Sequence, residues 1–179
     1  LYEHRPQNMN NVHPKEICEN FNFTYVKGDV SEKFLPKDSI ILVCGAGIIE
    51  KSIVQEYKVI NSHPGYIPNV RGLDALKWAI YEEQPIGVTT HVIGDAVDAG
   101  LIIERKLIPI YKNDTFHAVA QRVYDMEILM LVEAIEKIHE AHIYIEPSGY
   151  TLHKRMPNNI EATLMEKFEE LKVRLGKEE

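Results

Sequence analysis

Two polar side chains that could do chemistry stand two residues apart at the end of an apolar run. They are Asn61 and His63, and Pro64 and Gly65 directly behind them stop any regular structure. Residues i and i+2 of a strand project to the same side, so Asn61 and His63 point together. An amide can hold a developing oxyanion, and an imidazole can donate, accept or carry a proton near neutral pH. The pair fits a catalytic site, and it also fits an ordinary strand end with two satisfied polar residues.

A second polar segment, G-D-A-V-D-A-G at residues 94–100, separates two apolar stretches. Asp and Gly are common hairpin residues, so the segment also fits a plain turn. Its second carboxylate, Asp98, stands before a tight turn into an apolar strand, where it could orient an imidazole. Asn61, His63 and Asp98 together could stabilise a tetrahedral intermediate and move a proton. This is acyl transfer by direct attack, because no Ser or Cys is placed beside them as a nucleophile.

The elements that must position these residues alternate between helix and strand, which predicts an α/β fold with a parallel sheet. The strongest strand, within 38–47, is apolar on both faces, as a parallel strand covered by helices is. The next strand, 58–63, ends at the polar pair, and ligands of open α/β sheets bind at that end. Other strands are expected at 23–28, 87–95 and 100–110 (the last two antiparallel), with short strand or loop at 142–153. Helices are expected at 13–22, 50–57, 72–83, 116–138 and from 157 onward.

These motifs resemble the folate-dependent formyltransferase family. The segments N-S-H-P-G-Y-I-P-N-V-R-G, G-V-T-T-H and D-A-G-L-I-I follow one another in the family's order and spacing, between about residues 40 and 138. The resemblance implies a Rossmann-like formyltransferase fold with a largely parallel central sheet, lacking its first βα unit, plus a C-terminal helix. It also implies formyl transfer from N10-formyltetrahydrofolate to an amine, with Asn61, His63 and Asp98 as the catalytic residues.

The resemblance further implies where the two substrates bind. Main-chain groups of two segments would hold the pterin ring of the folate, and residues around the proline loop would contact the amine substrate. The implied pterin pocket comprises Cys44, Gly45, Ala46, Gly47, Ile48, Thr90, His91, Val92, Ile93, Gly94 and Asp95. The implied substrate contacts are Pro64, Tyr66 and Arg71.

Several of these side chains have a second interpretation. His91 fits a core histidine behind the pocket, Arg71 fits an exposed loop residue as well as a phosphate contact, and Trp78 fits helix packing. No metal site is predicted, because the histidines lack metal-like spacing. His139, His142 and His153 are expected on the surface, since no acidic partner is evident for them.

Charge and composition restrict the partners of this 179-residue chain. The formal net charge of -7 argues against binding of nucleic acid over the whole surface. No apolar run approaches the roughly 18 residues that a membrane span needs. Two cysteines far apart, Cys18 and Cys44, follow the pattern of cytosolic more than secreted proteins, so a cytoplasmic protein is predicted.

Comparison of the sequence with the branches of this family restricts which amine could accept the formyl group. The methionyl-tRNA branch carries a basic C-terminal barrel, whereas residues 145–179 hold six Lys or Arg and seven Asp or Glu. R-G-L-D-A-L-K-W-A-I at 71–80 resembles the sugar branch more than the purine branch. An amino sugar on a nucleotide is therefore the expected acceptor, and glycinamide ribonucleotide is the alternative. A relative that binds folate or a nucleotide sugar without catalysis, and a hydrolase of formyltetrahydrofolate, are further alternatives.

The chain is expected to divide into a catalytic part, 1–144, and a C-terminal extension, 145–179, with an amphipathic helix. The apolar stripe of that helix cannot stay in water on a lone helix. It must dock on the catalytic part or on a second copy of the chain, which would make a homodimer. The stripe comprises Ile160, Leu164, Phe168, Leu171 and Leu175.

Overall fold

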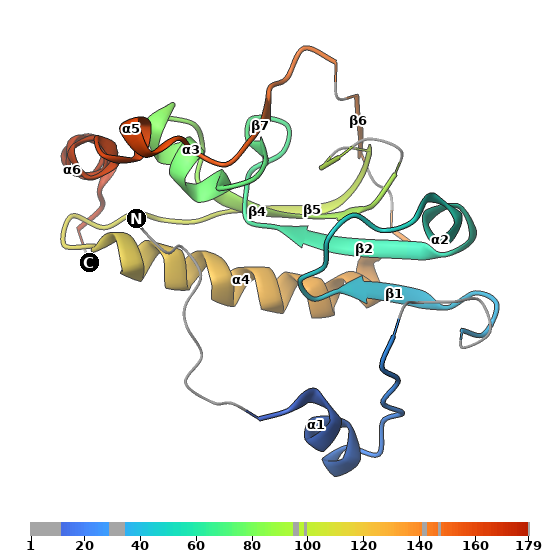
Figure 1. The fold of residues 1–179 in the computed structure, drawn as a ribbon. Coiled ribbons are helices and arrows are strands. Elements are labelled where there is room, and N and C mark those ends of the chain that lie inside the picture. The colour runs from blue at the N-terminus through green and yellow to red at the C-terminus, as the bar shows by residue number, and fades with distance from the viewer. Residues whose placement is uncertain are drawn as a thin grey trace.

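The computed structural model describes residues 12–28, 35–94, 97–98, 100–140, 143–146 and 148–178. A five-stranded sheet has the order β1-β2-β4-β5-β6 (Figure 1). Strands β3 and β7 form a separate pair. The elements are α1 (Pro14–Asn20), β1 (Ile40–Val43), α2 (Lys51–Glu56), β2 (Lys58–His63), β3 (Arg71–Gly72), α3 (Ala75–Tyr81), β4 (Gly87–Val92), β5 (Gly100–Leu107), α4 (Phe116–Lys137), β6 (Ile143–Ile145), β7 (Leu152–His153), α5 (Asn158–Glu161) and α6 (Leu164–Leu175).

The sheet is mixed. β1 and β2 are parallel and are joined through α2, whereas β2–β4, β4–β5 and β5–β6 are antiparallel. The α/β fold class and the antiparallel β4–β5 pair are confirmed. Among the described strands, the parallel part is smaller than the predicted largely parallel sheet, because the chain after β2 returns to the sheet in the opposite direction.

Helix α4 covers one face of the sheet (Figure 1). Thr115 caps its N-terminus by accepting a hydrogen bond from the backbone N–H of Ala118 at 3.1 Å. The apolar residues that recur at spacings of 3 and 4 along 116–138, from Phe116 to Ile138, are buried, apart from the half-buried Met126. Neither α4 nor any other helix in the described part of the chain is both long and apolar enough to cross a membrane.

Alternation along β2 decides which residues face the site. Ile60 packs with Leu131 and Ala134 of α4 in one buried cluster. Since neighbouring strand residues point to opposite faces, Asn61 and His63 face away from α4. The α4 side therefore supplies the hydrophobic support, and the other side of β2 presents the polar pair.

The C-terminal stripe docks on the same chain. Leu164, Phe168 and Leu171 of α6 are buried in the main core cluster together with residues of α3 and α4. The predicted continuous helix is interrupted between α5 and α6, where the Thr163 hydroxyl donates to the carbonyl of Ile160 at 2.9 Å and so competes with the helical backbone. The last stripe residue, Leu175, is exposed.

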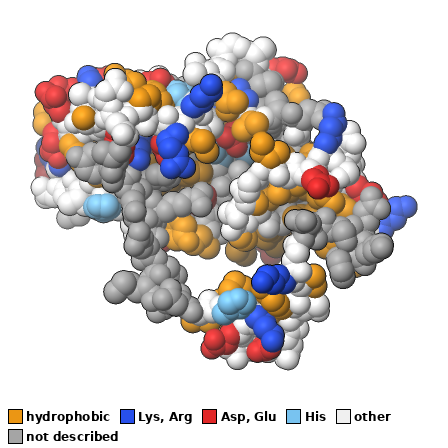
Figure 2. All heavy atoms as spheres, viewed as in Figure 1, with side chains coloured by type: hydrophobic (Ala, Val, Ile, Leu, Met, Phe, Trp, Pro, Cys, Tyr) orange, Lys and Arg blue, Asp and Glu red, His pale blue; other side chains and the backbone are white. Residues whose placement is uncertain are grey.

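Two local predictions are wrong. Residues 23–27 form no strand, although their β-branched and aromatic composition favours one. A strand needs a neighbour, and Phe23 is 66% exposed. Figure 2 shows hydrophobic side chains on the surface of this segment around α1, at the bottom of the view. Helix α3 begins at Ala75 instead of residue 72, because Asp74 takes a left-handed conformation with φ 53°.

Candidate active site

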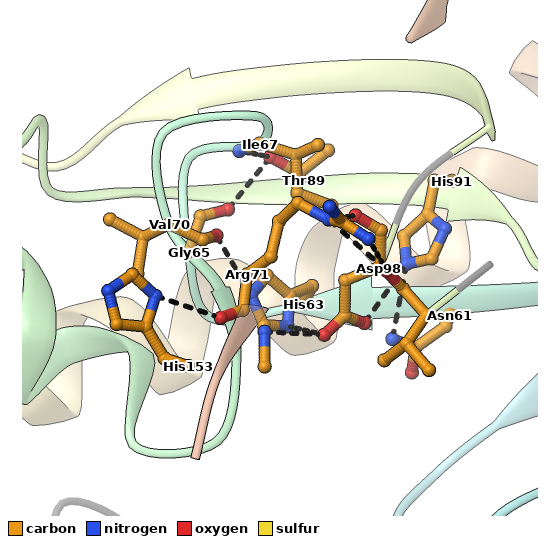
Figure 3. A network of polar contacts seen from close by, with 12 residues as sticks. Asn61, His63, Gly65, Ile67, Val70, Arg71, Thr89, His91, Asp98 and His153 are labelled. Carbon is orange, nitrogen blue, oxygen red and sulfur yellow. Dashed lines mark hydrogen bonds and ion pairs between the residues drawn. The ribbon is translucent and has the colours of Figure 1, made fainter. Parts of the chain in front are cut away.

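One face of the sheet gathers the polar residues that the motifs single out. β2 and β4 pair with Asn61 opposite His91 and His63 opposite Thr89. Opposite residues of a strand pair project to the same side, so these four side chains share one face. The side chain of Asp98 points toward them from the loop before β5 (Figure 3).

His63 and Asp98 face each other across this site. Nδ1 of His63 lies 3.5 Å from Oδ2 of Asp98, and the two side chains are 5% and 14% exposed. The same Oδ2 accepts a hydrogen bond from the backbone N–H of Gly72 at 2.8 Å. Asp98 has a left-handed backbone with φ 45°, which Asp tolerates better than most residues. Its carboxylate is thus held at the imidazole both by its own turn and by a backbone donor.

The hydrogen bonds of His63 define where its protons lie. Nε2 is 3.2 Å from the carbonyl oxygen of Val70, which can only accept, so Nε2 carries a hydrogen. Nδ1 then faces a carboxylate, and this contact is favourable when a second proton lies between the two groups. The pair is therefore arranged for an imidazolium beside a carboxylate, or for a neutral imidazole beside a protonated Asp98.

Asn61 joins this pair through a second histidine. Its Nδ2 lies 3.4 Å from Nε2 of His91, which is 1% exposed. The amide N–H donates, so Nε2 of His91 accepts and the ring is neutral when this bond forms. The same Nε2 lies 3.8 Å from Oδ1 of Asp98. This burial agrees with the second interpretation of His91 as a core histidine. An amide, two imidazoles and a carboxylate are in place to stabilise an oxyanion and to move a proton.

The loop after β2 is fixed by Thr89, which lies within the G-V-T-T-H segment but is not among the predicted site residues. Its Oγ1 donates to the carbonyl of Gly65 at 2.8 Å and accepts from the N–H of Ile67 at 3.0 Å. This places Gly65 against the ring of His63, where an added Cβ would lie 2.6 Å from Nε2. The alternation of side chains along β4 could have identified Thr89, because residues two apart in a strand project to the same face and Thr89 is two residues from His91.

The three residues predicted on the substrate side have different surroundings. Arg71 is 3% exposed, and its guanidinium donates to backbone carbonyls that include that of Asp98 at 2.8 Å. In this conformation Arg71 holds the loop, and it is neither an exposed loop residue nor directed outward toward a phosphate. Pro64 and Tyr66 are half-buried, and the guanidinium of Arg105 lies 5.0 Å from the centroid of the Tyr66 ring.

The first segment predicted to hold the pterin ring lies open beside the sheet. Residues 44–48 follow β1 and are exposed, and an added Cβ at Gly47 would meet no atom within 4 Å. Ile49 and Ile93 pack against the same buried cluster, so this segment and the chain after β4 share one hydrophobic support. The backbone between β1 and α2 is therefore accessible to a flat ring.

Only part of the second predicted pterin-binding segment, residues 90–95, has main-chain groups free to contact a ligand. Residues 90–92 lie within β4, whose main-chain groups pair with β2 on one side and β5 on the other. Thr90 is 0% exposed and shares the face of β4 that packs on α4, so it does not line the site. Gly94 is exposed and follows the strand, whereas Asp95 lies outside the described residues. The main-chain contacts to the pterin predicted for 90–92 are thus already used by the sheet.

His153 does not lie on the surface as predicted. It is 5% exposed, its Nδ1 lies 3.1 Å from the carbonyl oxygen of Arg71, and its Nε2 lies 3.0 Å from Oε2 of Glu82. The pairing of β7 with β3 brings it inside, and no local pattern in the sequence announces that pairing. Of the other two histidines expected at the surface, His139 is exposed and His142 lies outside the described residues.

Comparison with known families gives one match over most of the chain. Residues 26–135 match the family described as Formyl transferase. This range contains Asn61, His63 and Asp98, the residues that the geometry brings to one place.

Individual relatives come from several branches of that family, which include phosphoribosylglycinamide and methionyl-tRNA formyltransferases. A solved structure, the formyltransferase PseJ from Anoxybacillus kamchatkensis in complex with UDP-4,6-dideoxy-4-formamido-L-AltNAc and tetrahydrofolate, is 26% identical with a TM-score of 0.63, and the match covers 86% of this chain and 87% of that one. A phosphoribosylglycinamide formyltransferase of Bacillus subtilis is 34% identical over 83 residues, which are 45% of this chain. The trifunctional purine biosynthetic protein adenosine-3 of Chironomus tentans is 28% identical over 115 residues, 61% of this chain. The chain spans only 43% and 8% of the lengths of these two curated relatives.

Proposed function

The chain belongs to the formyl transferase family, and we propose that it transfers a formyl group from N10-formyltetrahydrofolate to the primary amine of an amino sugar carried on a nucleotide. The observation that carries the proposal is the cluster of Asn61, His63, His91 and Asp98 on one face of the sheet. These groups match what formyl transfer by direct attack needs, which is donors for an oxyanion and a base for the amine proton.

Asn61 and His63 are the proposed donors to the formyl oxygen. The acceptor amine attacks the formyl carbon while it is neutral, and negative charge develops on the oxygen. The Asn61 amide provides a preorganised dipole, and His63 provides the proton on Nδ1. The separation of 3.5 Å between Nδ1 and Asp98 exceeds that of a charged hydrogen bond, so the proton on Nδ1 can be shared with the oxyanion.

Asp98 is the proposed proton acceptor. The attacking nitrogen becomes positive and must lose a proton, either to the carboxylate directly or through a water. The backbone N–H of Gly72 holds one oxygen of Asp98 at 2.8 Å, so the group keeps its direction during the transfer. The folate nitrogen then takes up a proton as it leaves, which balances the reaction without a covalent enzyme intermediate.

The formyl donor is proposed to bind over the segment 44–49. Residues 44–48 of this segment are exposed, and its last residue, Ile49, packs on the same buried cluster as Ile93, which follows β4. Gly47 has open space beside its Cα, which suits close approach of a planar ring to main-chain donors and acceptors. The proposal now rests mainly on this loop and on the chain after Val92, since residues 90–92 are engaged in the sheet.

The choice of an amino sugar is supported by the PseJ structure, which matches this chain over 87% of its own length. Glycinamide ribonucleotide is a second candidate acceptor. The Bacillus subtilis phosphoribosylglycinamide formyltransferase favours it, since 83 residues align at 34% identity. Arg71 and Trp78 do not decide between the two, because one holds the 97–98 loop and the other packs on His153.

A competition assay with the full chain tests the function. The protein is incubated with N10-formyltetrahydrofolate and equal amounts of nucleotide-linked amino sugars and glycinamide ribonucleotide, and products are identified by mass spectrometry. Formylation of an amino sugar supports the proposal, and formylation of glycinamide ribonucleotide selects the second candidate. Formate release without acceptor would indicate a hydrolase. Tetrahydrofolate binding without any product would indicate a non-catalytic binding protein.

A further inference from the structure

The loop that carries Asp98 rests on the short strand β3. Nε of Arg71 donates to the backbone carbonyl of Asp98 at 2.8 Å, and the N–H of Gly72 donates to its Oδ2 at 2.8 Å (Figure 3). Both the backbone and the carboxylate of Asp98 are thus held by two consecutive residues of β3. A shift of β3 must therefore move the carboxylate that faces His63.

Strand β3 is in turn held by β7. The two strands pair in parallel, with Arg71 beside Leu152 and Gly72 beside His153. The N–H of Leu73 donates to the carbonyl of His153 at 3.0 Å, and Nδ1 of His153 lies 3.1 Å from the carbonyl oxygen of Arg71. A Cβ on Gly72, which has φ 92°, would overlap the carbonyl oxygen of His153, so the two backbones touch there. The position of β3 depends on His153 through its backbone and through its ring.

The ring of His153 is fixed on its other sides. Nε2 lies 3.0 Å from Oε2 of Glu82 on α3. The ring of Trp78 packs against it with centroids 4.8 Å apart, and Nε1 of Trp78 donates to the carbonyl of Lys154 at 2.8 Å. Both ring nitrogens of His153 face acceptors, so both hydrogen bonds form together when the ring carries two protons. The ring cannot turn away from Arg71 without breaking these contacts.

We propose that His153 is a positioning residue for formyl transfer: its Nδ1–H holds the carbonyl of Arg71, and β3 passes this constraint to the carboxylate of Asp98. The proposal rests on the proposed function of the Asn61–His63–Asp98 site. It makes the segment after residue 145 part of the catalytic geometry. A merely structural His153 would stabilise the fold without any preference for one ring nitrogen.

Two substitutions separate these roles. The side-chain nitrogen of Asn can take the place of Nδ1, and that of Gln can take the place of Nε2. H153N therefore keeps a donor for the carbonyl of Arg71 and loses the one for Glu82, whereas H153Q does the reverse. H139Q, at an exposed histidine, is the matched control.

The first measurement is steady-state kinetics of the full chain with both substrates. We expect kcat of H153Q to fall about ten- to a hundredfold, the range for a small misplacement of a reacting group, with KM values nearly unchanged. H153N and H139Q should keep kcat within about threefold of the unsubstituted chain. Equal kcat in H153N and H153Q, whether retained or lost, would overturn the proposal.

The second measurement does not depend on activity. Hydrogen exchange of the Gly72 amide, followed by NMR, reports its bond to the Asp98 carboxylate. We expect faster exchange in H153Q than in H153N, with amides of α4 unchanged in both. If the unsubstituted chain transfers no formyl group, the proposed function fails, and this comparison alone decides whether His153 holds Asp98. Unchanged Gly72 exchange in H153Q would then refute the positioning role.

Discussion

The imidazole of His63 lies directly against the Cα of Gly65. A Cβ at that position would come within 2.6 Å of Nε2 of His63 and 2.8 Å of the carbonyl oxygen of Val70. Those two atoms are themselves joined by a hydrogen bond, in which Nε2–H of His63 donates to the carbonyl oxygen of Val70. G65A should therefore displace the ring and lower kcat about tenfold or more, since a displaced catalytic group loses its geometry.

A double-mutant cycle checks whether His63 is the cause of this loss. Kinetics of G65A, H63A and the double variant are compared, together with thermal unfolding of each. We expect G65A to cost little further activity once the imidazole is gone. An equal loss from G65A in both backgrounds would mean that the added methyl group acts through the Val70 backbone.

Removing either member of the His63–Asp98 pair should affect turnover more than binding. H63A and D98N are each expected to lower kcat by a factor on the order of 10²–10⁴, the usual contribution of an acid–base group. The double variant should lose no more than about the worse single variant, because His63 and Asp98 lie side by side and are proposed to act as one unit in the same step.

Tetrahydrofolate affinity, measured by calorimetry, provides the control for this pair. It should change little, since the donor is proposed to bind over the 44–49 segment. A parallel loss of affinity and kcat would show instead that His63 and Asp98 maintain the fold.

The features that were predictable from the sequence are those set by local periodicity. The spacing of 3 and 4 along Phe116–Ile138 predicted α4, and alternation along β2 predicted that Asn61 and His63 share a face. The family was recognisable because several separated motifs occur in order, and the match over residues 26–135 confirms it.

The features that were not predictable depend on contacts between distant segments. Residues 23–28 have strand composition, yet a strand requires a partner that composition does not reveal. His153 has no acidic neighbour in the sequence, but Glu82 reaches it once β7 pairs with β3. The same pairing places Arg71 in β3, where its side chain is buried and donates to the carbonyl of Asp98. The burial of both side chains was not predictable because their surroundings are created by tertiary structure alone.

Replacing Asn61 by Asp should nearly abolish activity. The two side chains have almost the same shape, but a carboxylate would repel the oxyanion that develops on the formyl oxygen. It would also face Nε2 of His91 with an acceptor in place of the amide N–H that now lies 3.4 Å away. The test is kcat of N61D at neutral pH, with N61A as the control for simple loss of the donor. If N61D keeps most of the activity, Asn61 merely ends the strand.

The C-terminal helix should be needed for stability. Phe168 is 1% exposed and its ring meets that of Phe116 edge to face at 6.2 Å. F168A is expected to lower the free energy of unfolding by about 3–5 kcal/mol, the range for truncation of a buried Phe. V173A is the matched control on the same helix, since Val173 is 85% exposed. Equal unfolding midpoints of the two variants in urea would mean that α6 is not docked as described.

Asp114 should make stability depend on pH in the acid range. Burial by itself raises the pKa of Asp114, but hydrogen bonds from the Arg122 side chain and the Tyr111 backbone N–H, together with the charges of Arg122 and Lys172, lower this pKa below its ordinary value of 3.8. A carboxyl whose pKa is lower in the folded state stabilises the fold at pH values above 3.8. That contribution disappears as the pH falls through the lower folded value.

D114N should therefore lower the unfolding temperature at pH 7, because the amide cannot replace the charged partner of Arg122, whose Nη2 lies 2.8 Å from Oδ1 of Asp114. The difference between D114N and the unsubstituted chain should shrink as the pH falls below 3.8, since the unsubstituted chain then loses the same charge. D125N, at an exposed carboxylate on α4, should leave the unfolding temperature nearly unchanged at both ends of the range. Thermal unfolding between pH 7 and pH 2.5 measures all three proteins. A D114N deficit that stayed constant across this range would mean that hydrogen-bond geometry, and not charge, is what Asp114 contributes.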